Sequence, residues 1–278
     1  WELAAGEIVA PHGLEELIDR IQAEQGITYA PQQRQAVELA ATSQVMLLTG
    51  GPGTGKTTVA RLLARIYHAI GILSKGQLVE VDRSGLVAGF VGQTALKTGE
   101  VIEKALGGVL FIDEAYALVN QDNGNDFGRE AIEVLLKNME DHRKDLVVIV
   151  AGYSQLMEKF IHSNPGLESR FNKYFYFEDY DGAQLFTILQ SMCVKNGYVL
   201  TPEGEALARR ELMALYEDRD ENFGNARDVR NLFEQAVARQ SDRVARLEAP
   251  TREQLMELRP EDLAGPGDAS SPQGAMEV

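Results

Sequence analysis

Residues 50–57 read Gly-Gly-Pro-Gly-Thr-Gly-Lys-Thr and match the pattern G-x-x-x-x-G-K-S/T without a mismatch. The apolar run 45–49 precedes this segment and a helical pattern over 57–70 follows it, which is the strand–loop–helix setting that such a loop needs. Glycines let the backbone turn tightly, so that its N–H groups point at phosphate oxygens, and the start of the next helix adds partial positive charge. The segment therefore predicts a nucleotide phosphate site between a strand and a helix.

The residue types in this loop predict separate tasks. Lys56 is expected to reach the β- and γ-phosphates as a catalytic contact, and the Thr57 hydroxyl is expected to ligate Mg²⁺. The alternative is a glycine-rich turn without a ligand, which the in-register glycines, Lys and Thr disfavour. We therefore expect ATP and Mg²⁺ as cofactors. The residues expected to bind the nucleotide are Gly51, Pro52, Gly53, Thr54, Gly55, Lys56, Thr57 and Thr58.

A second motif indicates hydrolysis as well as binding. Residues 109–114 read Val-Leu-Phe-Ile-Asp-Glu, a buried-strand pattern that ends in two carboxylates. Asp113 at the end of the strand is expected to hold Mg²⁺ through its water shell, and Glu114 is expected to orient and deprotonate the attacking water. A protein that only bound ATP would not need the second carboxylate. The alternative is a strand that stops at a polar turn, which the upstream phosphate loop disfavours.

Composition limits the remaining classes. The chain has 278 residues and a formal net charge of −15, and this acidic balance disfavours nucleic acid as the main partner. No apolar run approaches the ~18 residues of a membrane span, and no secretory signal is visible. The single Cys193 excludes an internal disulfide and fits a reducing compartment, so we expect a cytoplasmic protein. The first residue is Trp1 and not Met, which indicates a fragment or a renumbered chain.

Strand-like and helical runs alternate through the first two thirds of the chain. The strand runs are 45–49, 78–81, 109–113, 146–151 and 174–177, and the helical patterns between them are 57–70, 95–106, 128–141 and 154–160. Such alternation predicts an α/β fold with a parallel sheet covered by helices on both faces, and a ligand at the carboxyl ends of the strands.

The pattern changes after about residue 179, where three amphipathic helices follow without a strand. Thr201 is expected to cap the second of these helices, since Pro202 stands at its start. We therefore expect four segments: an N-terminal helical segment over 1–44, a nucleotide-binding core over 45–179, an all-helical domain over 180–263 and a disordered tail over 264–278.

Several stretches together resemble the AAA+ ATPases, and within them the group of stage V sporulation protein K and the red-type rubisco activase CbbX. The stretches are Lys-Gly-Gln-Leu-Val-Glu-Val at 75–81, Gly-Gly-Val-Leu-Phe-Ile-Asp-Glu-Ala-Tyr at 107–116, Asp-Leu-Val-Val-Ile-Val-Ala-Gly-Tyr at 145–153, Ser-Asn-Pro-Gly at 163–166 with Ser-Arg-Phe at 169–171, and Gly-Asn-Ala-Arg-Asp-Val-Arg-Asn at 224–231. The resemblance covers roughly residues 50–243. It implies a P-loop NTPase core followed by a small helical lid.

The resemblance also implies roles for arginines. Arg170 falls where AAA+ proteins place an arginine finger, which would reach the γ-phosphate bound by a neighbouring subunit; the alternative is a surface ion pair. Arg227 falls at the sensor-2 position of the lid, where it would contact the phosphates in cis, and Arg230 is the second candidate. Many AAA+ proteins have Asn at the sensor-1 position, but the nearest residue here is Tyr153, so no water-positioning role is assigned to it.

Phe90, Val91 and Gly92 match the aromatic–hydrophobic–glycine pore loop of the family. The resemblance therefore implies a homo-oligomeric ring, with six subunits, in which these loops grip a client protein of unknown identity. The function so implied is an ATPase that couples Mg-ATP hydrolysis at subunit interfaces to remodelling of a protein through a central pore. The alternative for Phe90 is a buried core residue in a strand–helix connection.

Two other functions are weighed. Residues 27–37 resemble the segment before the phosphate loop of RecD-like superfamily-1 helicases, in which a Gln such as Gln32 or Gln33 reads adenine. This favours a nucleic-acid-dependent ATPase, but the acidic charge and the lid motif oppose it. His12-Gly13-Leu14 also resembles the adenine-side box of AAA+ proteins, so the segment that lines the adenine pocket stays open. A nucleotide-gated scaffold is the third possibility, which Glu114 and Arg170 oppose.

Overall fold

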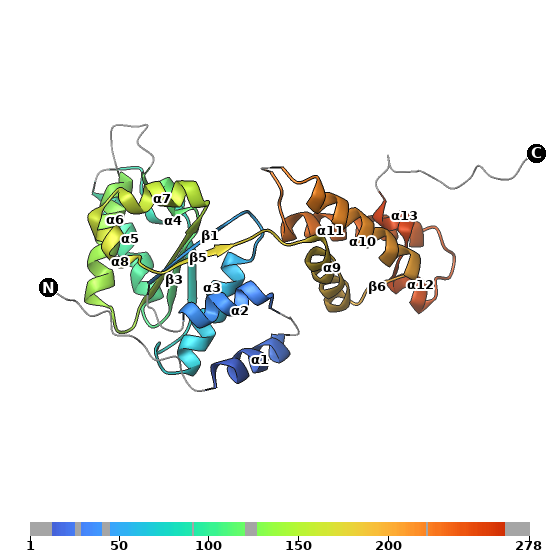
Figure 1. The fold of residues 1–278 in the computed structure, drawn as a ribbon, viewed down its shortest axis with the longest axis horizontal. Helices are drawn as coiled ribbons and strands as arrows, with labels where there is room; N and C mark the ends of the chain where they lie inside the picture. The colour runs from blue at the N-terminus through green and yellow to red at the C-terminus, as the bar shows by residue number, and fades with distance from the viewer. Residues whose placement is uncertain are drawn as a thin grey trace, which may run out of the picture. The chain divides into compact units, whose positions relative to one another are not determined.

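The computed structural model describes residues 13–25, 29–40, 45–90, 92–119, 127–220 and 222–264. The chain divides into two compact units, Trp1–Glu178 and Asp179–Val278, and each is described here by itself (Figure 1). Several sequence-based expectations fall partly or wholly outside the described ranges: residues 1–12, 26–28 and 41–44 of the predicted N-terminal segment, which include His12 of the adenine-side box, Val91 in the pore loop, and the tail from residue 265 onward.

Unit 1 is built on a sheet of five parallel strands in the order β2-β3-β4-β1-β5, which confirms the predicted α/β fold. The strands keep the predicted places to within a residue, because each is an apolar run between polar turns. They are β1 (Val45–Gly50), β2 (Leu78–Val81), β3 (Val109–Ile112), β4 (Val147–Gly152) and β5 (Tyr174–Phe177).

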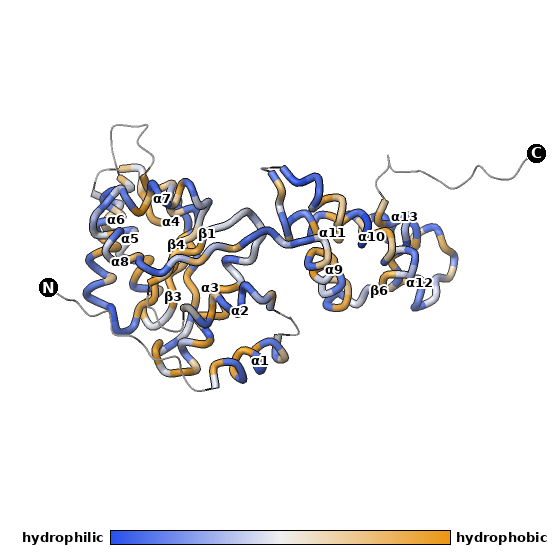
Figure 2. The backbone as a smooth tube through the Cα atoms, viewed as in Figure 1, coloured by the Kyte–Doolittle hydropathy of each residue, from blue (hydrophilic) through white to orange (hydrophobic). Residues whose placement is uncertain are grey.

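Helices cover both faces of this sheet. Alternate residues of a strand point to opposite faces, so Met46 and Leu48 of β1 join one apolar core while Leu47 joins the other. Figure 2 shows β3 and β4 as hydrophobic strands, as expected for strands buried on both faces. The helices of the first layer are α1 (Leu14–Gln25), α2 (Pro31–Ala40) and α3 (Lys56–Ala69), and those of the second are α4 (Arg83–Leu86), α5 (Gln93–Ala105), the 3₁₀ turn η1 (Ala115–Val119), α6 (Phe127–Asp141), α7 (Ser154–His162) and α8 (Pro165–Arg170).

The parallel arrangement brings the carboxyl ends of all five strands to one edge of the sheet. At this edge Gly50, the last residue of β1, pairs with Phe177, the last residue of β5. A Cβ on residue 50 would lie 2.5 Å from the Phe177 carbonyl oxygen, and the φ angle of Gly50 is 142°. Only glycine fits this close approach of two backbones without displacing a strand.

Unit 2 is helical, as predicted, with one short parallel strand pair that the sequence does not predict. The predicted cap is present, since Thr201 Oγ1 accepts a hydrogen bond from the Gly204 N–H at 3.1 Å. The elements of the unit are α9 (Gly182–Asn196), β6 (Val199–Leu200), α10 (Pro202–Glu217), α11 (Ala226–Val244), α12 (Arg252–Met256), β7 (Glu257–Leu258) and α13 (Pro260–Leu263), with β6 paired to β7.

A buried ion pair closes the C-terminal end of unit 2. Asp262 of α13 is 1% exposed, and its carboxylate lies 2.8 Å from Nη2 of Arg243 on α11. Arg243 Nε donates a second hydrogen bond to the same carboxylate, and Nη2 also donates to the Glu257 carbonyl of β7. The bidentate geometry of a guanidinium suits such a pair. The pair therefore ties α13 and β7 to α11.

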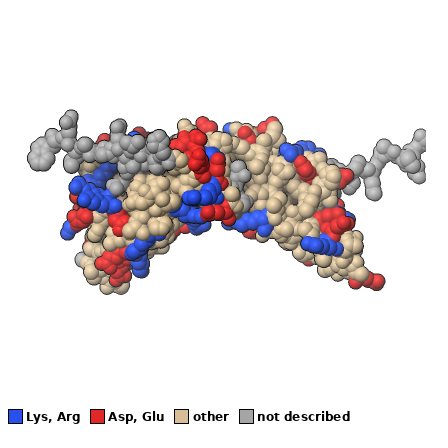
Figure 3. Space-filling model, turned by 90° about the horizontal axis from the view of Figure 1, so that it is seen from below, with Lys and Arg blue, Asp and Glu red and all other residues tan. Residues whose placement is uncertain are grey.

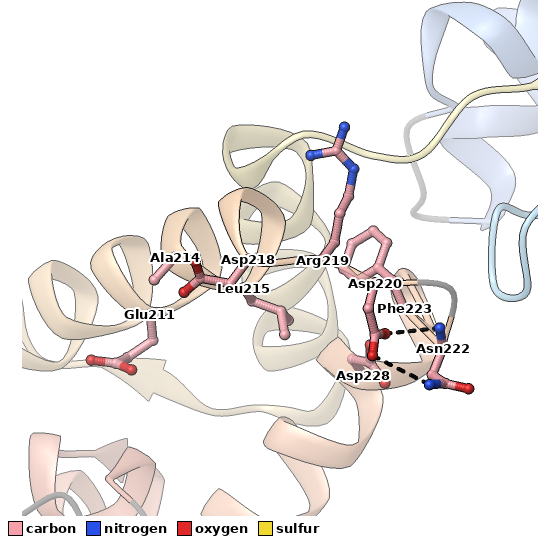
Figure 4. A pocket seen from close by; sticks show the side chains of 9 residues that line it. All are labelled: Glu211, Ala214, Leu215, Asp218, Arg219, Asp220, Asn222, Phe223 and Asp228. Carbon is pink, nitrogen blue, oxygen red and sulfur yellow. Dashed lines mark hydrogen bonds between the residues drawn. The ribbon is translucent and has the colours of Figure 1, made fainter.

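An open pocket lies between the end of α10 and the start of α11 (Figure 4). Asp218, Asp220 and Asp228 line it together with Leu215 and Phe223. Two of these carboxylates are already bonded locally: Asp220 accepts from the Asn222 backbone N–H, and Asp228 accepts from the Gly224 N–H at 2.7 Å. The pocket thus marks where the α10–α11 connection folds back on itself, and it contains none of the sequence-predicted site residues.

Candidate nucleotide-binding site

The predicted phosphate loop connects β1 to α3 at the carboxyl edge of the sheet. Gly53 and Gly55 have φ angles of 69° and 93°, in the left-handed region that glycine adopts without strain. Thr54 is 1% exposed, and its hydroxyl donates to the Gly51 carbonyl at 2.9 Å. The Lys56 ammonium donates to the Gly51 carbonyl at 2.6 Å and so lies within the loop. The loop therefore has the compact fold that its sequence predicts.

The first turn of α3 fits a phosphate group. Gly55 at the N-cap provides no side-chain hydrogen bond to the helix, and the first turn contains no acidic residue. The first backbone N–H groups of a helix have no partner within the helix, and together with the helix dipole they favour an anion. Lys56, Thr57 and Thr58 stand in this turn, so their N–H groups and side chains suit the β- and γ-phosphates of a nucleotide.

Asp113 and Glu114 follow β3 at the same edge, where β4 lies between β3 and β1. Neighbouring strands are about 4.8 Å apart, so the ends of β3 and β1 are separated by about 10 Å, which a hydrated magnesium ion and a phosphate can bridge. Asp113 is half-buried and Glu114 is exposed. Thr57 and Asp113 offer the oxygen atoms that Mg²⁺ prefers, and Glu114 offers a carboxylate to a water molecule.

Glu114 has a strained backbone and an aromatic neighbour. Its φ angle is 48°, and among the described residues only Asn225 shares a positive φ with it outside the glycines. Burial, and then the negative charge of the Glu114 carboxylate, raises the pKa of the Tyr116 phenol to about 12. Strained residues cluster at functional sites, so this geometry is consistent with the predicted role of Glu114.

The ring of Tyr153 lies beside that of Tyr116, which is close in sequence to Glu114. Tyr153 follows β4 at the carboxyl edge, and its ring centroid lies 6.1 Å from that of Tyr116. A Cβ on Gly152 would lie 2.8 Å from Cδ1 of Tyr116, so glycine at the end of β4 makes room for that ring. Sequence reasoning gives Tyr116 no role. Its position two residues after Glu114 is the signal that points to it.

Arg170 lies at the opposite edge of the sheet from the phosphate loop. It ends α8, and β5 begins four residues later, so Arg170 stands at the amino ends of the parallel strands. Its guanidinium pairs with Glu140 in the last turn of α6 at 3.6 Å and donates to the Gly166 carbonyl at 3.3 Å. The six-residue strand β1 separates the two edges by about 20 Å. Unit 1 therefore does not bring Arg170 to its own phosphate loop.

Arg227 and Arg230 lie on the first two turns of α11 in unit 2, and both are exposed. Within the described part of the chain we find no ion pair or side-chain hydrogen bond for the Arg227 guanidinium. The turn before it is well ordered by hydrogen bonds, since the Arg227 N–H donates to the Gly224 carbonyl at 3.0 Å. Arg227 is thus available to a ligand on the surface of unit 2.

Phe90 is exposed, which excludes the alternative of a core residue. Its side chain is 72% exposed on the connection between α4 and α5, and Gly92 has a φ angle of 77°. Nearby, Leu96 on the first turn of α5 is 70% exposed. Two large apolar side chains therefore face solvent beside this loop.

The base of this loop is fixed to α5 by side-chain hydrogen bonds. Thr94 Oγ1 accepts from the Ala88 N–H at 3.1 Å, and the Thr98 hydroxyl donates to the Leu86 carbonyl at 3.0 Å. Lys97 Nζ donates to the Val87 carbonyl at 3.0 Å. The exposed tip at Phe90 thus stands on an anchored base.

The two candidate adenine segments lie on the same face of the sheet, where α1 and α2 pack with α3. Gln33 is buried, and its Oε1 caps the Ala30 N–H at 2.9 Å. Gln32 is less buried, and its Nε2 donates to the Glu178 carboxylate at 3.2 Å. Leu14 is a core residue. Of the two glutamines, Gln32 is the one whose amide lies near the surface.

Comparison with known proteins follows this division of the chain. The family model of ATPases associated with various cellular activities (AAA) matches residues 46–179, and the AAA lid domain matches residues 181–273. Protein CbbX of Cereibacter sphaeroides is 45% identical over 84% of this chain and 75% of its own length. The chain belongs to the AAA+ ATPases.

Two further relatives place it more closely in this family. Stage V sporulation protein K of Bacillus subtilis is 38% identical over 95% of this chain and 83% of its own length. The chloroplastic ribulose bisphosphate carboxylase/oxygenase activase of Cyanidioschyzon merolae is 47% identical over 72% of this chain and 67% of its own length. This AAA+ ATPase is therefore of the CbbX and stage V sporulation protein K group, as the sequence motifs indicate.

The described residues lack two kinds of feature. Among them no helix combines the length and apolarity that crossing a membrane requires. Nor do they contain a cluster of three or more His, Cys, Asp or Glu side chains with the geometry of a metal site. In the view of Figure 3, acidic and basic side chains are interspersed on the surface of each unit.

Proposed function

We propose that this AAA+ protein is the subunit of a six-membered ring that hydrolyses Mg-ATP at subunit interfaces and uses the energy to remodel a protein partner through a central pore. One observation carries the proposal: Arg170 lies at the sheet edge opposite to Lys56 and Glu114. An arginine that stabilises the transferred phosphoryl group must reach it directly. Arg170 of one subunit therefore completes the site of the next.

Four side chains of the loop and of the β3 turn have separate tasks in this reaction. Lys56 and the N–H groups of α3 bind the β- and γ-phosphates. Mg²⁺ held by Thr57 and Asp113 would supply charge neutralisation on those phosphates. Glu114 orients the attacking water and accepts its proton, and Arg170 of the neighbouring subunit stabilises the charge that develops on the phosphoryl oxygens.

The work output involves the Phe90 loop. An exposed aromatic side chain grips an extended peptide by packing and does not read its sequence. One relative is named for its action on ribulose bisphosphate carboxylase/oxygenase, so this enzyme is the first client to test. A Glu114→Gln variant under ATP should hold the client in place for affinity capture.

The test of assembly uses two inactive variants. Arg170→Ala and Glu114→Gln should each bind ATP and lack turnover when assayed alone. Mixed one to one, about a quarter of the interfaces pair an intact Glu114 with an intact Arg170, because each interface of a ring is heterologous. Turnover should recover accordingly. No recovery at any mixing ratio, or full activity of a strictly monomeric wild-type sample, would contradict the proposal.

A second measurement separates a protein remodeller from a nucleic-acid-dependent ATPase. ATP turnover is measured with a candidate client protein and with single-stranded DNA under the same salt conditions. We expect stimulation by the client and none by DNA. Stimulation by DNA alone would favour the helicase-like function, and nucleotide-dependent assembly without any turnover would favour a scaffold.

A further inference from the structure

Asn225 adopts a backbone conformation that ordinarily belongs to glycine. Its φ and ψ angles are 53° and −125°, and it is fully buried. Any residue with a Cβ is strained in this region, and glycine is not. A side chain that persists at such a position is held there by its contacts, so the contacts of the Asn225 amide indicate what the residue does.

The Asn225 amide is not used to cap the helix that follows it. Asparagine at an N-cap commonly accepts a hydrogen bond from the second or third N–H of its helix, but α11 receives no such bond. Instead, Oδ1 accepts from the Tyr180 N–H at 2.9 Å, and Nδ2 donates to Oδ1 of Asp179 at 2.8 Å. Both ends of the amide are therefore bonded to the first two residues of unit 2.

The two residues at the junction between the units are bonded to different units. Glu178 is the last residue of unit 1, and its carboxylate accepts from Gln32 on α2 of the same unit at 3.2 Å. Asp179 is the first residue of unit 2, where it bonds Asn225 and lies 3.8 Å from Arg219. The backbone between Glu178 and Asp179 is thus the point at which one set of contacts ends and the other begins.

We propose that Asn225 is a positioning residue, which fixes the first turn of α11, and with it Arg227, to the residue at which unit 2 begins. A change in the angle between the units is then confined to the backbone around Glu178 and Asp179. Arg227 moves together with Asn225 in such a change, since only Ala226 separates the two residues. This inference rests on the proposed function together with the sensor-2 role, a contact with the nucleotide, that the family resemblance implies for Arg227.

Substitutions at residue 225 separate positioning from folding. Asn225→Gly relieves the backbone strain but removes the Oδ1 acceptor that the buried Tyr180 N–H has in the wild type, so these opposing effects should leave the melting temperature close to that of the wild type. The ATP turnover of Asn225→Gly should nevertheless fall about tenfold, toward the level of Arg227→Ala, since one well-placed hydrogen bond to a charged ligand carries about that factor. Asn222→Gly, at an exposed asparagine three residues earlier, is the control and should behave like wild type.

A charge swap tests the Asn225–Asp179 contact itself. Asn225→Asp places two carboxylates within hydrogen-bond distance and should lower turnover as Asn225→Gly does. Combining it with Asp179→Asn restores a donor opposite an acceptor and leaves the Tyr180 N–H with its partner. The double variant should recover to within about twofold of wild type if the contact is what matters. If the contact only stabilised the fold, the melting temperatures of these variants would change, and their ATP turnover would not follow this pattern of loss and recovery.

A distance measurement gives a readout independent of turnover. Spin labels on Lys137→Cys in unit 1 and Arg210→Cys in unit 2 report the distribution of distances between the units, and Cys193 is too buried to take a label. Asn225→Gly should broaden this distribution relative to wild type, with and without a non-hydrolysable ATP analogue.

Each outcome decides between the two proposals. If Arg227→Ala lowers turnover and Asn225→Gly does not, or if the distance distribution is unchanged in Asn225→Gly, the positioning role is overturned. If the wild type lacks turnover, the proposed function fails, and if Arg227→Ala leaves turnover unchanged, the sensor-2 role of Arg227 fails. The distance distribution then still decides whether Asn225 fixes α11 to the junction.

Discussion

Glu114 combines an exposed carboxylate with a backbone that the rest of the turn must hold in place. Its φ angle of 48° is unfavourable for a residue with a side chain. The turn is held by the Asp113 side chain, whose Oδ1 accepts from the Glu114 N–H at 3.0 Å, and by the Ala117 N–H, which donates to the Glu114 carbonyl. The strained backbone of Glu114 is therefore held by hydrogen bonds within its own turn.

The first prediction concerns this carboxylate. Glu114→Gln should keep ATP affinity and lower turnover by at least about 100-fold, because an amide cannot accept the proton of the attacking water. The measurement combines steady-state ATPase kinetics with binding of a fluorescent nucleotide. Glu103→Gln, on the exposed face of α5, is the matched control. A Glu114→Gln protein that turns over ATP at the wild-type rate would rule out Glu114 as the base.

Local motifs were predictable at this scale, whereas contacts between distant residues were not. The phosphate loop and Asp113-Glu114 are contiguous patterns, so residue type and spacing suffice to find them. The approach of Tyr116 to Tyr153 depends on the pairing of β3 with β4, which no single segment encodes. For the same reason, sequence reasoning could not choose between His12-Gly13-Leu14 and Gln32-Gln33 as the lining of the adenine pocket.

Among the elements, α5 does more than cover the sheet. Its inner face contributes Thr94, Lys97 and Thr98 to the base of the loop after α4, and Thr94 and Thr98 are fully buried. Buried polar side chains are retained when they are hydrogen-bonded. The helix therefore supports a loop whose tip is exposed, and a motion of α5 would move Phe90 with it.

The second prediction tests this element. Phe90→Ala should change the free energy of unfolding by less than about 0.5 kcal/mol, since an exposed side chain leaves no cavity, whereas a core phenylalanine would cost about 3–5 kcal/mol. Basal ATP turnover should persist, and client remodelling should be lost. Phe90→Tyr, which keeps the ring, is the matched control and should retain remodelling. Thermal melting together with a client assay checks these expectations. Normal remodelling by Phe90→Ala would remove Phe90 from the client contact.

At the level of the whole molecule, the two units differ in the interactions that hold each of them together. Unit 1 is held together by a sheet that helices cover on both faces. Hydrophobic periodicity alone was enough to predict this fold. In unit 2 a buried ion pair joins Arg243 of α11 to Asp262 of α13, 19 residues further along the chain. A buried ion pair has no periodic pattern, so the sequence indicated the helices of this unit and not the contact that joins them. The β6–β7 pair escaped prediction because each strand is only two residues long.

The third prediction concerns this ion pair. Asp262→Ala leaves the Arg243 guanidinium without its buried partner and should lower the stability of unit 2 by about 3 kcal/mol. Hydrogen exchange should show loss of protection in α11, with α3 and the sheet of unit 1 unaffected. Glu261→Gln, on the same short helix but 58% exposed and 4.0 Å from Arg243, is the matched control and should have little effect. Equal loss of protection in both variants would refute the assignment.

The Gly50–Phe177 pair has a mechanical consequence. Beyond this last residue pair, β1 continues directly into the phosphate loop. Strand β5 is followed immediately by Glu178, the last residue of unit 1. A pull on the chain from unit 2 would therefore reach the backbone that supports the phosphate loop. The absence of a side chain at residue 50 lets the backbones of β1 and β5 lie in direct contact, so a displacement of residue 177 is transmitted to residue 50 with little loss.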